Sequence, residues 1–165
     1  MTAVIRDAAA PDFARITQIY ADHVLNGFGT FEEVPPSCDE MRRRHAEVRE
    51  RGLPYLVAAD GDAVLGYAYA ALYRVRSAYR FTVEDSVYVA DAAMRRGLGA
   101  KLLDGVIAGC AAAGMKQMVA VIGDSDNRAS IALHEKCGFR RVGVLTDVGF
   151  KRNRWVDTVI MQRRL

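Results

Sequence analysis

Helical and extended segments alternate along the second half of the chain, and each helical segment ends at a glycine. Helical periodicity runs from about Leu98 to Ala113 and from Asn127 to Cys137, and these helices end at Gly114 and Gly138. The short apolar run Met118 to Ile122 lies between them and predicts a strand. A chain that alternates in this way is constrained to a layered α/β domain.

The first half of the chain supplies most of the remaining elements. We expect one helix from Pro11-Asp12 and a second after Ser37, where Ser37 and Glu40 form a capping box and Gly52-Leu53-Pro54 ends the helix. The other predicted strands are Val4-Ile5, Tyr55 to Ala59, Val64 to Leu72, Phe81 to Val89, Val142 to Leu145 and Trp155 to Met161. The order β-α-α-β-β-β-α-β-α-β-β predicts one domain, residues 1–165, with a mixed central β-sheet flanked by helices.

The composition is that of a folded chain with a core of ordinary size. Of the 165 residues, 51% are hydrophobic and 26% are charged, which excludes a disordered protein. No apolar run approaches the roughly 18 residues of a membrane span, and the first ten residues lack the pattern of a secretion signal. We therefore expect a soluble, cytoplasmic protein with no membrane partner.

Charge, cysteines and histidines exclude further classes of protein. The net charge of +3 is too small to favour nucleic acid as the partner. Residues 140–165 carry seven basic and two acidic side chains, so this segment either faces an anion or forms a solvated surface. Cys38, Cys110 and Cys137 share no metal spacing and fit a reducing compartment, and the three scattered histidines predict no metal site.

The clearest chemical signal lies between Ser86 and Ala100. The extended run Ser86 to Val89 leads through Arg95-Arg96-Gly97-Leu98-Gly99-Ala100 into a helix. The first N–H groups of a helix have no partner within it and the helix dipole is positive there, so this loop can bind a pyrophosphate through its backbone. The alternative is that the glycines serve packing only. The spacing matches neither a dinucleotide-binding motif nor a P-loop.

Two stretches of the second half together resemble a known family. The loop at Arg95 to Ala100 and the helix Asn127 to Phe139 are similar to the coenzyme A half of the GNAT acetyltransferase superfamily. Further stretches resemble its phosphinothricin acetyltransferase group: Arg74 to Tyr79, Thr82 to Glu84, Ser86 to Val89, Val119 to Gly123, Leu133 to Glu135 and Gly149 to Lys151. The resemblance covers nearly the whole chain and implies a GNAT fold with acetyl-CoA as the acetyl-donor cosubstrate. It departs from the superfamily at Met94, where the loop usually begins with Gln or Arg.

Two residues are candidates for catalysis. Strand alternation places Thr82, Glu84 and Ser86 on one face, where the Glu84 carboxylate can take the amine proton directly or through a water. The resemblance implies the same role, and a solvent-facing acid is the alternative. His134 stands where many GNAT enzymes have a tyrosine that protonates the departing thiolate. It is expected to donate that proton or to orient the amine, unless it is only a packed histidine.

The resemblance also implies binding sites for donor and acceptor. Acetyl-CoA is expected to contact the strand end, the glycine loop and the next helix, with thioester polarisation by backbone N–H groups near Val89. These residues are Val87, Tyr88, Val89, Arg95, Arg96, Gly97, Leu98, Gly99, Ala100, Asn127 and Ser130. The acidic group of the acceptor is expected to bind Arg74, Arg76 and Tyr79, although a solvated basic loop is the alternative. Phe31 is expected to wall the acceptor pocket, within an irregular segment (residues 25–38) that is long enough to act as a lid.

We therefore predict a GNAT-fold N-acetyltransferase that moves acetyl directly to the free amine of a small amino-acid-like acceptor, phosphinothricin or an analogue. Acceptors of the methionine sulfone or sulfoximine type, and a peptide or protein amine, remain alternatives. A non-catalytic acyl-CoA-binding module is a more remote one. The resemblance implies a homodimer, with the basic aromatic end around Trp155 as a candidate interface, whereas His23 is expected to be merely packed.

Overall fold

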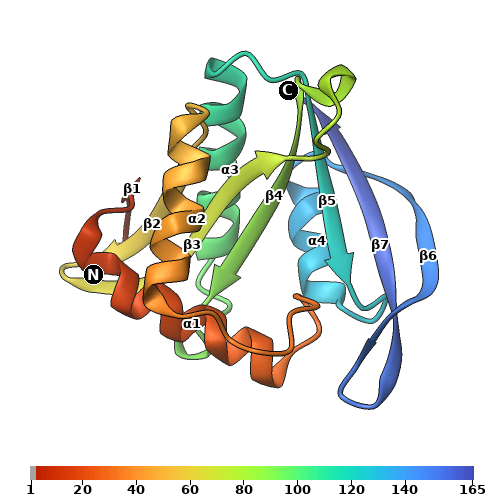
Figure 1. Ribbon diagram of the computed structural model, residues 1–165, viewed down its shortest axis with the longest axis horizontal. Coiled ribbons are helices and arrows are strands. Elements are labelled where there is room, and N and C mark those ends of the chain that lie inside the picture. Colours follow the sequence, from red (N-terminus) through yellow and green to blue (C-terminus); the bar gives the residue numbers. More distant parts are fainter. Residues whose placement is uncertain (1–2) are drawn as a thin grey trace.

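One seven-stranded sheet, in the order β1-β2-β3-β4-β5-β7-β6, organises residues 3–165, the part of the chain that the computed structural model describes. In Figure 1 the strands fan across the molecule. The strands are β1 (Val4–Asp7), β2 (Tyr55–Asp60), β3 (Ala63–Leu72), β4 (Thr82–Val89), β5 (Gln117–Gly123), β6 (Arg140–Lys151) and β7 (Arg154–Arg164). The α-helices are α1 (Phe13–Asn26), α2 (Cys38–Glu50), α3 (Leu98–Ala112) and α4 (Arg128–Lys136). The predicted fold class and element order are confirmed.

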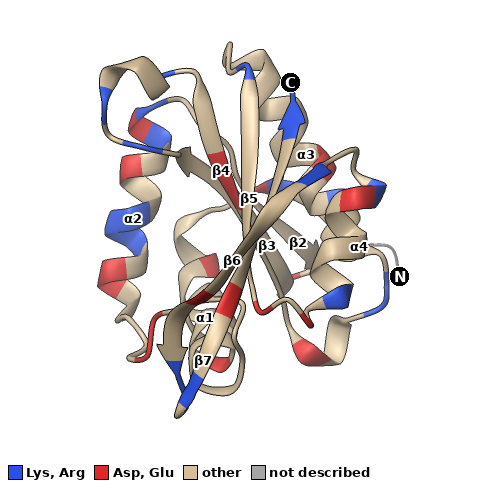
Figure 2. Cartoon of the chain, turned by 90° about the vertical axis from the view of Figure 1, so that its right-hand side faces the viewer, with Lys and Arg blue, Asp and Glu red and all other residues tan. Residues whose placement is uncertain are grey.

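The helices cover both faces of the sheet. Figure 2 shows α1 and α2 on one side of the strands and α3 and α4 on the other. The face beneath α1 carries stacked tyrosines, because Tyr67 packs 5.3 Å from Tyr88, whose ring lies 5.0 Å from Tyr20 of α1. Alanines alternate with the tyrosines along β3, so the opposite face stays flat enough for α3 to pack closely.

The second helix begins as predicted, with one difference in its cap. Ser37 Oγ accepts the backbone N–H of Glu40 at 3.1 Å, which is the expected N-cap bond. The Glu40 carboxylate pairs instead with Arg43 and Arg44, at 2.7 and 2.8 Å. Two cations one turn along the helix therefore compete with the backbone for the second half of the capping box.

Strands β4 and β5 pair over only three residues. Their parallel register joins Thr82, Val83 and Glu84 to Gln117, Met118 and Val119. Beyond Glu84, β4 continues to Val89 and β5 to Gly123 along diverging paths (Figure 1). On its other side β4 stays close to β3, because a side-chain carbon at Gly66 would lie only 2.9 Å from the Tyr88 carbonyl oxygen. The sheet is therefore split at its centre, and β4 has one open edge.

The edge strand β6 is longer than the predicted Val142 to Leu145. Its pairing with β7 shifts register between Arg141 and Gly143 and again between Leu145 and Gly149, and Asp147 has a φ of 52°. These bulges interrupt the alternation on which the sequence prediction depends. The hairpin turns at Arg152-Asn153, where both residues have positive φ, of 51° and 61°, as a tight two-residue hairpin requires.

Within residues 3–165, none of the helices has the length and apolar character needed to cross a membrane.

Candidate active site

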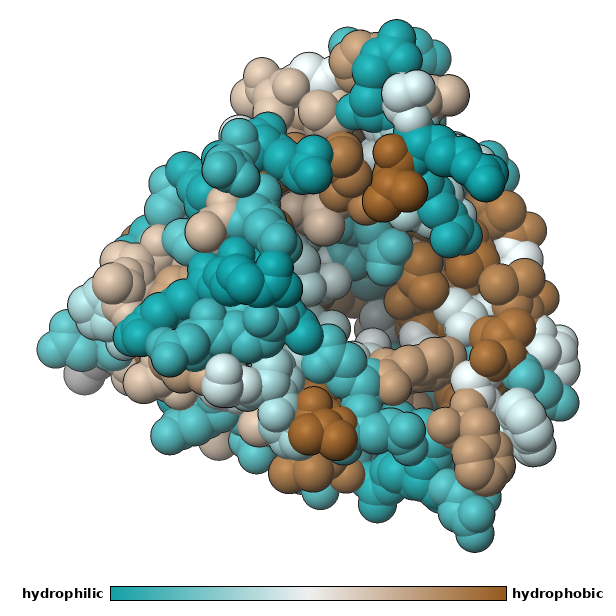
Figure 3. All heavy atoms as spheres, in the orientation of Figure 1, coloured by the Kyte–Doolittle hydropathy of each residue, from teal (hydrophilic) through white to brown (hydrophobic). Residues whose placement is uncertain are grey.

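A cleft of about 850 Å³ opens where β4 and β5 diverge. Its walls are the end of β4, the end of β5, the first turn of α3 and one side of α4, and Thr30 and Phe31 also line it. Figure 3 shows the surface hollowed near its centre, where the two strands part in Figure 1. This volume lies toward the upper end of the range for small-molecule sites, so it can hold two reactants.

The open edge of β4 presents backbone donors to the cleft. Ala90 N–H donates to the Leu65 carbonyl at 2.9 Å, toward β3. Successive peptide groups of a strand point to opposite edges, so the N–H groups of Val89 and Val87 point toward β5. No β5 residue pairs with this stretch in the described part of the chain. Such fixed donors can polarise a carbonyl oxygen and stabilise negative charge on it.

The start of α3 presents free backbone N–H groups to the cleft. Gly97 caps the helix with a φ of 73°, and a side-chain carbon there would meet nothing within 4 Å. The first intrahelical bond runs from Lys101 N–H to the Gly97 carbonyl, which leaves the N–H groups of residues 98–100 available. Gly97, Leu98, Gly99 and Ala100 line the cleft. A phosphate can therefore approach this end of the cleft closely.

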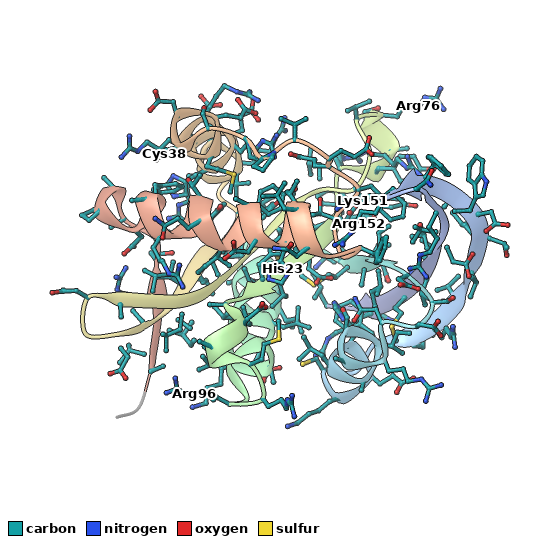
Figure 4. The ribbon with its side chains drawn as sticks, turned by 90° about the horizontal axis from the view of Figure 1, so that it is seen from below. His23, Cys38, Arg76, Arg96, Lys151 and Arg152 are labelled. Atoms are coloured by element: carbon teal, nitrogen blue, oxygen red, sulfur yellow. The ribbon has the colours of Figure 1, made fainter. Side chains whose placement is uncertain are left out.

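The other residues predicted to bind the cofactor occupy different places. Gly99 has a packing role as well, since a side-chain carbon there would lie 3.2 Å from Leu133 of α4. Arg95 lines the cleft, whereas Arg96 is exposed and lies at the edge of the molecule in Figure 4. Asn127 lines the cleft and caps α4, because its Oδ1 accepts Ser130 N–H at 3.2 Å.

Glu84 lies half-buried in the cleft at the last paired position of β4, within the acidic stretch that Figure 2 shows in that strand. Burial raises the pKa of its carboxyl group, the neighbouring charge of Asp85 raises it further, and the charge of Arg74 opposes both. A carboxylate with a raised pKa is a stronger base than an ordinary glutamate. The predicted alternation holds, because Val83 and Asp85 are buried on the opposite face.

His134 is held at both ring nitrogens. Nδ1 donates to the Ser130 carbonyl at 2.7 Å, and Nε2 lies 2.9 Å from Oδ2 of Asp85. Burial tends to lower the pKa of His134, but the hydrogen bond to Asp85 and its charge outweigh this, so the pKa lies above the ordinary value. Because both nitrogens face acceptors, the imidazolium is the form that satisfies the geometry. His134 also lines the cleft.

Two polar residues at the site were not singled out from the sequence. Asp85 follows Glu84 in an otherwise apolar strand, and that second acid was the available signal. His23 was expected to be merely packed, but it lines the cleft and its Nε2 lies 3.0 Å from the Val89 carbonyl oxygen. Since a carbonyl only accepts, Nε2 is the protonated nitrogen. His23 therefore holds in place the peptide group between Val89 and Ala90, which directly follows the Val89 N–H.

The four predicted acceptor residues separate into two groups. Phe31 lines the cleft. Arg74, Arg76 and Tyr79 belong to the exposed loop before β4 and are not among the described residues that line it. Arg76 points away from the body of the molecule in Figure 4. Arg74 is closer to the chemistry, because its charge affects the pKa of Glu84.

Comparison with known proteins agrees with this geometry. The family model described as an acetyltransferase (GNAT) domain matches residues 5–160. The chain is 55% identical to phosphinothricin N-acetyltransferase from Alcaligenes faecalis over 162 residues, which is 98% of this chain and 81% of that protein. It is 40% identical to the L-methionine sulfoximine/L-methionine sulfone acetyltransferase of Pseudomonas aeruginosa over 166 residues, covering 100% of this chain and 96% of that one.

A solved structure matches over the full chain. The GNAT superfamily phosphinothricin acetyltransferase from Sinorhizobium meliloti, in complex with AcCoA, superimposes with a TM-score of 0.96. Its sequence is 49% identical, and the match covers 100% of this chain and 89% of that one.

Proposed function

The chain belongs to the GNAT acetyltransferase family, and from that premise we propose that it moves the acetyl group of acetyl-CoA to the free amine of a small amino-acid-like acceptor. The observation that carries the proposal is the split between β4 and β5. It brings a backbone anion site, open N–H groups and a half-buried carboxylate into one cleft. Relatives named for phosphinothricin and for methionine sulfoximine support an acceptor of that class.

The residues of the cleft fit acetyl-CoA. The free N–H groups of residues 98–100 and the space beside Gly97 suit the pyrophosphate. Val89 N–H, held in place by the His23 bond to the following carbonyl, suits the thioester oxygen. Asn127 and Ser130 lie where the pantetheine arm would pass between these two points. Met94, which replaces the usual Gln or Arg of the superfamily, also lines the cleft, beside the loop that would bind the pyrophosphate.

Glu84 serves as the general base in this proposal. An amino acid arrives mostly as an ammonium ion and must lose a proton before its nitrogen can attack the thioester. Glu84 takes that proton directly or through one water, while Val89 N–H stabilises the negative charge that develops on the carbonyl oxygen. Transfer is direct, without a covalent enzyme intermediate.

His134 stabilises the departing thiolate through its charge. Its two ring nitrogens are engaged by Ser130 and Asp85, so donating a proton would leave a neutral ring against the Asp85 carboxylate. The raised pKa of His134 extends the cationic form of the ring to higher pH than in an ordinary histidine. We assign His134 this electrostatic role in preference to that of proton donor.

The acceptor's acidic group is assigned to Arg74 in the first place. All three side chains are exposed, but the charge of Arg74 lowers the pKa of Glu84, which places Arg74 nearest to the proposed base. In this proposal Arg76 and Tyr79 contribute only when their loop moves over the bound acceptor.

The test of the function is an acetylation screen read by thiol release. The panel contains phosphinothricin, methionine sulfoximine, methionine sulfone, unmodified methionine and a short peptide with a free N-terminus. We expect turnover with the first three and little with the peptide. Preferred turnover of the peptide would favour the protein-amine alternative, and binding of acetyl-CoA without turnover of any amine would favour the acyl-CoA-binding module.

The donor site has its own test. Gly97→Asp places a carboxylate in the open space at the start of α3 and is expected to weaken acetyl-CoA binding at least about tenfold in calorimetry. Gly52→Asp is the matched control, because Gly52 has a φ of 69° beside the 73° of Gly97 and equally open surroundings. Equal affinities in the two variants would contradict the assignment.

The assembly is proposed to be a homodimer formed through β6. This outermost strand exposes nine consecutive residues, from Arg140 to Val148, so neither of its faces is covered. Large apolar side chains on β6 and β7 are 41–62% exposed: Val142, Val144, Leu145, Val148, Phe150 and Trp155. An edge strand of this kind pairs readily with the same strand of a second copy. Light scattering on wild type and Val144→Lys tests this, and a monomeric wild type would overturn it.

The proposed location is the cytoplasm. The donor is acetyl-CoA, and Cys38, Cys110 and Cys137 are all free thiols, as a reducing compartment favours.

A further inference from the structure

The segment of residues 25–38, predicted to be long enough to act as a lid, forms a loop over residues 27–37 that is held by contacts on both sides of Phe31. Lys151 is almost fully buried and its Nζ donates to the Thr30 carbonyl at 2.7 Å. Tyr20 Oη and Thr30 Oγ1 lie 2.9 Å apart, and the Glu32 carboxylate pairs with Arg44 at 2.6 Å. Figure 4 shows Lys151 beside the end of α1, where this loop begins. These contacts hold the chain on both sides of Phe31, so we expect a change beside the ring to move the ring more than the loop.

The Phe31 ring lies in a slot formed by two glycines. A side-chain carbon at Gly149 would overlap the ring, lying 2.8 Å from Cδ2 and from Cζ and closer still to Cε2. A side-chain carbon at Gly123 would lie 3.1 Å from Cε1. Gly149 does not have a positive φ, so no left-handed backbone conformation requires a glycine there. The space for the ring is thus the structural reason for a glycine at position 149.

We propose that Gly149 is a specificity-determining residue, which acts by giving the Phe31 ring room to lie against the β6–β7 hairpin and so sets the width of the acceptor end of the cleft. The proposal rests on the function proposed above, since it takes the acceptor to be an amino acid. Any side chain at 149 displaces the ring away from the hairpin. Because Thr30 and Glu32 hold the backbone, the ring turns toward the cleft that it lines.

Gly149→Ala is expected to change the KM for the acceptor but not the KM for acetyl-CoA. Intrusion of about one methyl group's volume into a pocket changes discrimination by about 10- to 200-fold. We expect the acceptor KM to rise within that range, more for methionine sulfone than for alanine, while the KM for acetyl-CoA changes less than about twofold. Gly143→Ala is the matched control, since it adds the same methyl group to β6 where nothing lies within 4 Å.

A double-variant cycle tests whether the effect passes through the ring. In a Phe31→Ala background, Gly149→Ala should change the acceptor KM less than about twofold, because no ring remains to be displaced. The same large change in that background would overturn the proposal, as would an unchanged acceptor KM in Gly149→Ala or a parallel rise in the KM for acetyl-CoA.

Thermal unfolding gives a second readout that does not depend on activity. Gly149→Ala should lower Tm, and adding Phe31→Ala to it should recover part of that loss. If Gly149→Ala does not fold, recovery of folding in the double variant supports the contact, and failure of both variants overturns it. A wild type that acetylates no amino acid would refute the proposed function, whereas an active wild type with an unaltered Gly149→Ala profile would refute this inference alone.

Discussion

Glu84→Gln provides the sharpest test of the chemistry. The amide keeps the shape of the side chain and its ability to accept a hydrogen bond, but it cannot take a proton from the acceptor amine. Glu84 lies in the cleft at the point where β4 and β5 separate, and the raised pKa of its carboxyl group suits it to that transfer. We therefore expect a large fall in kcat with little change in either KM.

The expected size of the loss follows from the surroundings. General-base catalysis contributes about 10²- to 10⁴-fold, which corresponds to about 2.7–5.5 kcal/mol of activation free energy. Glu84 is only half-buried and the cleft is open, so water competes for the amine proton. The loss in kcat should accordingly fall in the lower half of that range, at about 10²- to 10³-fold.

The pH dependence separates a base from a positioning residue. The active form of Glu84 is the carboxylate, so wild-type kcat/KM should fall on the acid side at a pH above the ordinary glutamate range. In Glu84→Gln this acid limb should disappear, and the loss should shrink as the pH approaches the pKa of the acceptor amine itself. Glu135 is an exposed acid beside His134, so Glu135→Gln is the control for the loss of one negative charge.

Thiol release under saturating substrates, measured between pH 5.5 and 9.5, supplies the assay. A Glu84→Gln enzyme with near wild-type kcat at pH 7 would refute the reasoning, because it would show that water alone removes the proton. A loss that stays constant across the whole pH range would also refute it, since a fixed loss indicates misplacement of the acceptor.

Two further predictions concern charges around the cleft. Arg74→Gln removes the charge that holds down the pKa of Glu84, so the acid limb of kcat/KM should move to higher pH, whereas the exposed Arg76→Gln should leave the limb in place. Asp85→Asn leaves the buried His134 cation without its partner and should cost about 3–5 kcal/mol in urea unfolding at pH 5.5. Because the folded pKa of His134 is raised, its stabilising effect is complete below about pH 6.5 and fades above the folded pKa, so the gap between Asp85→Asn and wild type should narrow by pH 9.

The element order was predictable because local chemistry determines it. Helical periodicity and the glycines that end the helices determine α3 and α4. The observed α3 (Leu98–Ala112) ends one residue before the predicted end, and the observed α4 (Arg128–Lys136) is one residue shorter than predicted at each end. The strand β6 was predicted too short for an equally local reason. Its bulges around Asp147 break the alternation that identifies a strand from sequence.

The contacts that complete the site lie beyond local patterns. Asp85 and His134 are 49 residues apart, and no periodicity relates them. Phe31 and Gly149 come from opposite ends of the chain and meet only when the β6–β7 hairpin folds against the loop. A glycine without positive φ leaves no conformational signal in the sequence, because its function is to leave room for another residue.

The buried pair of Asp85 and His134 contributes both to the proposed reaction and to the width of the cleft. Helix α4 follows β5 along the chain, and His134 joins that helix to β4 across the open part of the sheet. Asp85 Oδ1 is buried without a partner among the described residues, so the pair is not arranged for the greatest stability. Its geometry instead fixes the separation between β4 and α4, the two walls between which acetyl-CoA would bind. A change at Asp85 should therefore weaken acetyl-CoA binding and also lower the free energy of unfolding. Glu84→Gln leaves both walls in place, so it should not produce this joint loss.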